Sequence, residues 1–250
     1  MMSRFKSNHY IFVLLLLVAL ADACKKEKTA EPEQETGTVT DVMGNTYKTV
    51  KIGDQWWMAE DLKATKYRDS SFISLVPPPP FDTTWSNFGS GACCYNVDPA
   101  GHTIGILYNY YAVIDPRGIA PVGWHIPSDE EWKELERHLG MPAEDTGNTG
   151  WRGTHEGEKM KVTRGTVNGW ADYGSIWPTN ESGFSALATG CRMFDGSWGN
   201  PGLSSTEFWW SSSAQSTTKA WYRYLDYKNA NVFRYYGLKN YGFSIRCVKD

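Results

Sequence analysis

The sequence predicts a loop-rich α+β fold with short antiparallel strands and one or two helices. Two observations predict it. Residues 123–140 carry a complete helix signal, whereas most of the remaining chain alternates short β-type runs with Gly, Asn and Ser. A single amphipathic helix with one apolar stripe must bury that stripe against a flat neighbour, and a β-sheet supplies one.

The first residues are typical of an export signal. Arg4 and Lys6 form a positive region, Ile11–Ala21 is an apolar run, and Ala21-Asp22-Ala23 is a small-residue cleavage site. The run is too short to span a bilayer comfortably. We therefore expect residues 1–23 to be a signal peptide.

Cys24 follows the cleavage site directly, and two interpretations stay open. In one, a signal peptidase cleaves after Ala23 and releases the chain. In the other, which we favour, the segment resembles a bacterial lipoprotein signal and Cys24 is lipidated. The typical motif has Leu three residues before the Cys, where this chain has Ala21, with Leu20 one position earlier. Acyl chains would then anchor the protein in a membrane.

Residues 24–37 hold no large apolar side chain and are expected to be a disordered tether. The chain has a formal net charge of −3, and no basic block lies beyond the leader and the tether. A nucleic-acid partner is therefore not expected. The remaining residues, 38–250, are predicted to form one domain.

The N-terminal part of this domain is predicted to form strands. Residues 38–40 and 46–52 are β-type runs around a turn-rich interval, so we expect a hairpin, and a second turn leads into 55–58. Residues 104–113 favour a strand or a short helix.

The strongest element is the helix. Ser128 can cap it and Glu131 can reach back to the Ser128 N–H, which is a capping box. Trp132, Leu135 and Leu139 form one apolar stripe, and Gly140 can end the helix.

The last fifty residues are predicted to form a β-meander, from four aromatic or β-branched runs divided by Asn, Gly and Ser. The runs are 207–213, 220–227, 231–236 and 243–248.

An exported chain with an even number of cysteines beyond Cys24 can form two disulfides, from Cys93, Cys94, Cys191 and Cys247. The sequence cannot choose among the three pairings, although a vicinal bridge would be strained. No zinc-type spacing, metal-protease motif, phosphate-binding loop or nucleophile elbow occurs. We therefore predict no metal, no cofactor and no enzymatic activity.

Six segments, in order, resemble one family. They are Thr38 to Lys63, Leu107-Tyr-Asn-Tyr-Tyr-Ala112, Gly123-Trp-His-Ile-Pro-Ser-Asp-Glu-Glu-Trp132, Asn180-Glu-Ser-Gly-Phe-Ser-Ala186, Phe208-Trp-Trp-Ser-Ser212 and Gly242-Phe-Ser-Ile-Arg-Cys-Val248. Together they resemble the Fibrobacter succinogenes major paralogous domain. The resemblance implies a C-type-lectin-like fold related to formylglycine-generating enzymes, in a lipoprotein of the outer membrane or cell surface.

The resemblance leaves function open, because fold does not confer function. We expect a non-enzymatic surface module that binds a glycan or an envelope protein, with a membrane contact through its lipid. Aromatic side chains suit such recognition because they bring large contact areas. The expected ligand-binding residues are Trp209, Trp210, Tyr222, Tyr224 and Tyr235.

Two alternatives remain. One is a structural or assembly component of the cell envelope. The other is a formylglycine-generating-type oxidase, which is disfavoured because that family uses a pair of nearby C-terminal cysteines and Cys247 is alone in its region.

Overall fold

The computed structural model describes residues 34–78, 84–98, 100–199 and 204–250. The predicted signal peptide and Cys24 lie outside these residues, as does nearly all of the predicted tether. Gln34–Asp250 forms one compact unit. This unit contains both of the large hydrophobic cores described below, so it holds the packing that a domain needs to fold by itself.

Strands dominate this unit, and they form four sheets within the described residues. The largest sheet joins both ends of the domain, in the order β1 (Thr36–Thr40), β2 (Thr46–Ile52), β3 (Gln55–Met58), β14 (Val248–Lys249) and β7 (Trp124–His125). A four-stranded antiparallel sheet has the order β11 (Thr206–Ala214), β12 (Lys219–Asp226), β13 (Val232–Leu238) and β8 (Gly150–Arg152). Two smaller sheets are β4 (Ser74–Leu75), β5 (Ala92–Val97), β6 (Thr103–Tyr108), and β10 (Trp198–Gly199) with β9 (Cys191–Arg192).

The helices are few and mostly short. They are α2 (Tyr110–Val113), α3 (Asp129–His138), α4 (Ala143–Thr146) and α5 (Glu156–Met160), with a 3₁₀ turn, η2, at Trp85–Asn87. The prediction of an α+β, C-type-lectin-like fold is therefore wrong, and the described chain is mostly β. The error has a physical cause: strands of two or three residues, such as β4, β8 and β9, are too short to show a period of two in the sequence.

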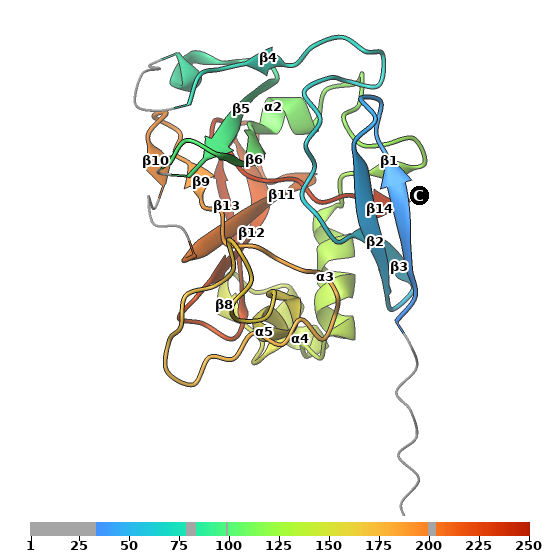
Figure 1. Ribbon diagram of the computed structural model, residues 1–250, viewed down its shortest axis with the longest axis vertical. Helices are drawn as coiled ribbons and strands as arrows, with labels where there is room; N and C mark the ends of the chain where they lie inside the picture. The colour runs from blue at the N-terminus through green and yellow to red at the C-terminus, as the bar shows by residue number, and fades with distance from the viewer. Residues whose placement is uncertain (1–33, 79–83, 99, 200–203) are drawn as a thin grey trace, which may run out of the picture. The chain divides into compact units, whose positions relative to one another are not determined.

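The long helix is as predicted. α3 begins after Ser128, whose hydroxyl accepts from the Glu131 N–H while the Glu131 carboxylate accepts from the Ser128 N–H. Trp132 is fully buried and contacts Trp57 of β3 and Trp209 of β11, with ring centroids 4.9 and 6.0 Å apart. The helix thus lies between the two larger sheets, as Figure 1 shows.

The four-stranded sheet separates two hydrophobic cores. Trp210 belongs to one core and its neighbour Trp209 to the other. Adjacent residues of a strand point to opposite faces, so β11 contributes one tryptophan to each side.

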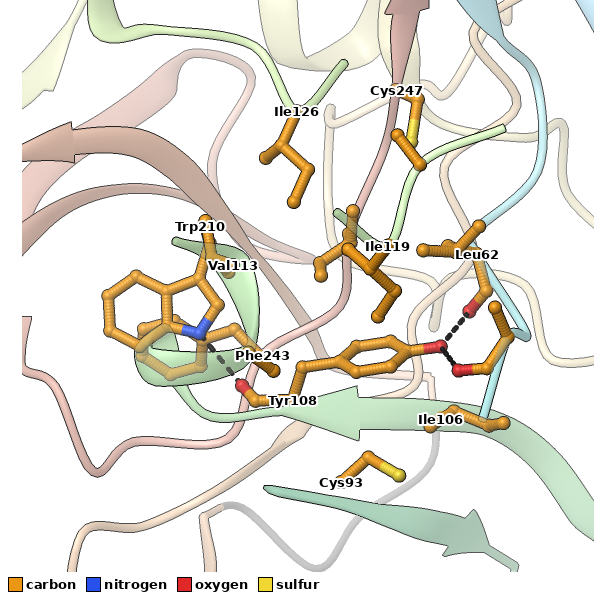
Figure 2. Close-up of a cluster of buried hydrophobic side chains, with 14 of the residues drawn as sticks. Leu62, Cys93, Ile106, Tyr108, Val113, Ile119, Ile126, Trp210, Phe243 and Cys247 are labelled. Carbon is orange, nitrogen blue, oxygen red and sulfur yellow. Dashed lines mark hydrogen bonds between the residues drawn. The ribbon is translucent and has the colours of Figure 1, made fainter. Parts of the chain in front are cut away.

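We call the core that contains Trp210 the first core. Tyr108 lies in this core and makes hydrogen bonds through both its side chain and its backbone. Its hydroxyl faces the carbonyl oxygens of Leu62 and Ala64 at 3.1 and 2.8 Å, and the Trp210 indole donates to the Tyr108 carbonyl at 2.8 Å (Figure 2). A buried tyrosine or tryptophan needs such partners, because an unpaired polar atom in a core is costly.

Candidate functional site

The candidate site is the aromatic face of the four-stranded sheet, on the same side as Trp210. One row of directly paired residues crosses all four strands: Trp151 of β8, Phe233 of β13, Tyr224 of β12 and Phe208 of β11. We call it the first aromatic row. Paired positions in an antiparallel sheet lie on one face with their Cβ atoms about 5 Å apart, so the four rings are held side by side.

A second aromatic row lies two residues further along the same strands. It consists of Tyr235 of β13, Tyr222 of β12 and Trp210 of β11. Phe233 and Tyr235 connect the two rows, with ring centroids 5.9 Å apart.

Exposure changes systematically along both rows. On β11, Trp210 is fully buried and Phe208 packs against the first core, whereas Trp151 and Tyr235 are 37% and 38% exposed. The accessible end of the aromatic face therefore lies on β8 and β13. We define the exposed end as Trp151, Phe233 and Tyr235.

The rings of this exposed end pack against further aromatic rings of the same face. Tyr224 stacks on Phe208 at 4.4 Å, and Phe208 stacks on Phe243 at 5.1 Å. Trp151 then contacts Tyr224 and Phe233 at 5.2 and 5.1 Å. Because aromatic neighbours fix one another in these geometries, the exposed rings are positioned before any ligand arrives.

The tyrosines give the aromatic face polar hydroxyl groups, and one of them has a carboxylate partner. The Tyr224 hydroxyl donates to the Asp226 carboxylate at 2.7 Å. Burial, followed by this hydrogen bond, raises the pKa of Tyr224, and burial also raises the pKa of Tyr222. Both phenols are neutral at physiological pH.

Tyr222, Tyr224 and Tyr235 share the aromatic face, as a ligand-binding surface requires. Trp209 and Trp210, in contrast, are both fully buried, and the Trp209 indole donates to Asp61 at 2.8 Å. Their prediction as ligand-binding residues is therefore not supported. The consecutive apolar residues Phe208, Trp209 and Trp210 place large side chains on both faces of β11, and both faces are covered by a core.

Sequence reasoning missed Trp151 and Phe233. Trp151 stands in a glycine-rich segment, and β8 has only three residues. Its one signal is a tryptophan between a glycine and an arginine, which becomes informative only when β8 is seen paired with β13.

The predicted disulfides are absent. No disulfide joins Cys93, Cys94, Cys191 and Cys247, and all four residues are buried. Burial raises the pKa of Cys93 and Cys191 to about 12, and it also raises the pKa of Cys247. Such thiols remain protonated and act as small core side chains.

The described part of the chain was compared with two simple requirements, one for a metal site and one for a membrane-spanning helix. Those residues include no group of three or more His, Cys, Asp or Glu side chains arranged to hold a metal ion. None of their helices has the length and apolar character needed to cross a membrane.

These features define a mostly β domain with an aromatic sheet surface. The sequence model of the Fibrobacter succinogenes major domain matches residues 50–249. The chain belongs to this family. It matches no curated protein and no solved structure at a significant level.

Proposed function

We propose that this protein is an exported binding module whose aromatic face recognises a glycan, without catalysis. The observation that carries the proposal is the exposed end, where Trp151, Phe233 and Tyr235 form a continuous apolar platform with a polar margin. Sugar rings present apolar C–H faces and polar edges, and aromatic rings with hydrogen-bonding groups nearby complement both.

The ligand chemistry follows from the charge of the surface. Tyrosine, tryptophan and phenylalanine supply no net charge, and the carboxylate bonded to Tyr224 is Asp226. Asp226 beside Tyr224 and Lys219 near Tyr235 place one charge of each sign by the face, so we propose a neutral oligosaccharide as the ligand.

The predicted signal peptide and Cys24 support a location at the cell surface. A lipid on Cys24 would tether the module to the outer membrane, leaving the folded unit free to meet ligands outside. A protein ligand in the envelope, or a purely structural role there, is the alternative that the following experiment distinguishes.

The test is a glycan array with neutral and acidic oligosaccharides. It uses the chain from residue 24 with Cys24→Ser, so that neither a lipid nor this thiol interferes. We expect binding to neutral glycans, weakened about tenfold by Trp151→Ala or Tyr235→Ala, because one aromatic contact contributes about 0.5–1.5 kcal/mol.

Trp177→Ala is the matched control, because Trp177 is 61% exposed and belongs to neither aromatic row. Binding should be unchanged in this variant. A blank array with folded protein would overturn the glycan proposal and favour an envelope protein or a structural role. Binding that survives both Trp151→Ala and Tyr235→Ala would place the site elsewhere.

A further inference from the structure

The strand β1 has one unpaired edge. Among the described residues, it is the outermost strand of the five-stranded sheet and pairs with β2 alone (Figure 1). Four of its five residues, Thr36–Thr40, are exposed, and Val39 is half-buried. An edge strand of this kind presents unpaired N–H and C=O groups to any strand that can reach it.

Two hydrogen bonds, one at each end of the β1–β2 ladder, show which backbone N–H and C=O groups of β1 point towards β2. The Lys51 N–H donates to the Glu35 carbonyl at 2.9 Å, and the Asp41 N–H donates to the Asn45 carbonyl at 3.0 Å. Hydrogen-bonded and non-hydrogen-bonded pairs alternate in an antiparallel ladder. The odd-numbered residues of β1 therefore bond to β2.

Consequently Thr36, Thr38 and Thr40 direct their backbone N–H and C=O groups outward. Along the described part of the chain, no backbone hydrogen bond outside the β1–β2 ladder reaches these three residues. The open edge thus offers three donors and three acceptors at regular spacing.

This edge lacks the usual protection against pairing. Its sequence, Thr-Gly-Thr-Val-Thr, has no charge and no proline, and its register with β2 is continuous from Thr36 to Thr40. Soluble proteins commonly block such edges with Lys, Pro or a bulge. Threonine and valine also favour extended backbone.

We propose that β1 is the interface of a two-fold dimer, in which it pairs antiparallel with β1 of a second copy. The outward residues are spaced symmetrically about Thr38. Thr38 therefore lies opposite the partner's Thr38, and Thr36 lies opposite the partner's Thr40. All three positions are then hydrogen-bonded pairs, and the two five-stranded sheets become one continuous sheet.

Charge is compatible with this register along β1 itself, because Thr36, Thr38 and Thr40 are uncharged. Just beyond them, Glu35 lies opposite the partner's Asp41. The repulsion between these carboxylates is reduced because Glu35 pairs with Lys51 at 2.7 Å and Asp41 accepts bonds from Met43, Asn45 and Tyr47. A second copy fits the edge because the same strand supplies both halves of a self-complementary pattern.

The first test is sedimentation of the chain from residue 24, with Cys24→Ser, from micromolar to millimolar concentration. We expect a reversible shift from monomer to dimer mass. Thr38→Lys and Thr38→Glu should each lose dimerisation, because residue 38 faces itself across the two-fold axis. An equal mixture of these two variants should recover a dimer, since opposite charges then face each other.

Thr38→Pro tests the hydrogen bonds themselves. Its N–H points outward, so proline removes an intermolecular bond without removing a bond to β2. The dimer should be lost and the monomer should stay folded, whereas Thr38→Val keeps the N–H and should keep the dimer. Hydrogen exchange should show the amides of Thr36, Thr38 and Thr40 protected only at dimer concentrations, with the Gly37 and Val39 amides protected throughout.

A chain that stays monomeric at every concentration would overturn the proposal. A dimer that persists in folded Thr38→Pro would overturn it equally, because the interface would then lie on another surface.

Discussion

At the residue scale, the most unusual group is Glu207 of β11. Its carboxylate is fully buried and accepts from the Thr189 N–H at 2.7 Å. Burial, followed by the nearby Asp61 carboxylate, raises its pKa to about 8, although the bonds from Thr189 and Ser244 oppose the rise. The folded protein therefore holds a proton here that an unfolded chain would release.

This proton makes stability depend on pH. Because the folded pKa lies above the ordinary value, the contribution of Glu207 to stability is fully present below about pH 4.5 and is lost as the pH rises towards about 8. Glu207→Gln mimics the protonated acid and removes the titration. We compare the free energy of unfolding of Glu207→Gln with that of the native chain by urea unfolding. The variant's value minus the native value should increase by about 2 kcal/mol or more from pH 5 to pH 8. If the difference in the free energy of unfolding is the same at both pH values, Glu207 is ionised in the folded protein.

At the scale of the element, α3 has a wider buried face than its apolar stripe predicts. Asp129 and Glu136 lie three residues before and four residues after Trp132, beside the stripe, and they are buried as well. Glu136 accepts two bonds from Arg152, both at 2.7 Å, and one from Arg223 at 2.6 Å. This cluster joins the helix to β8 and β12.

Removing Glu136 should therefore be costly. Glu136→Ala leaves Arg152 and Arg223 buried without this partner, and we expect a loss of about 3–5 kcal/mol in the free energy of unfolding. Glu134→Ala is the control two residues away on the same helix, where the side chain is exposed, and it should change stability by no more than about 0.5 kcal/mol. Equal losses in the two variants would mean that the helix is not held by this cluster.

At the scale of the whole molecule, the four-stranded sheet has a hydrophobic core on each face at β11 and opens to solvent towards β13 and β8. Trp209 and Trp210 fill the two cores, whereas Trp151 lies at the open end. The same residue type thus stabilises the fold at one end of the sheet and is available for recognition at the other.

Substitution should separate these roles. Trp209→Ala leaves a large cavity in a core and should lower the free energy of unfolding by about 3–5 kcal/mol. Trp151→Ala should lower it by about 1 kcal/mol or less. Thermal or urea unfolding of the two variants measures the difference. If Trp209→Ala were as stable as Trp151→Ala, the assignment of Trp209 to a core would fail.

The sequence by itself determined those elements whose signals are local. The capping box at Ser128, the run that became β2 and the meander of β11 to β13 each depend on neighbours within a few residues. The family was also readable, because its motifs are ordered along the chain.

Only the tertiary structure decided which aromatic residues are accessible. Local sequence does not show which of Trp209, Trp210 and Trp151 is exposed, because exposure depends on what covers each face of the sheet. The four cysteines and the carboxylates of Asp129, Glu136 and Glu207 were likewise ambiguous, because burial is set by segments far away in the sequence. Pairing across the sheet is a long-range property, and it alone brings Trp151, Phe233 and Tyr235 together.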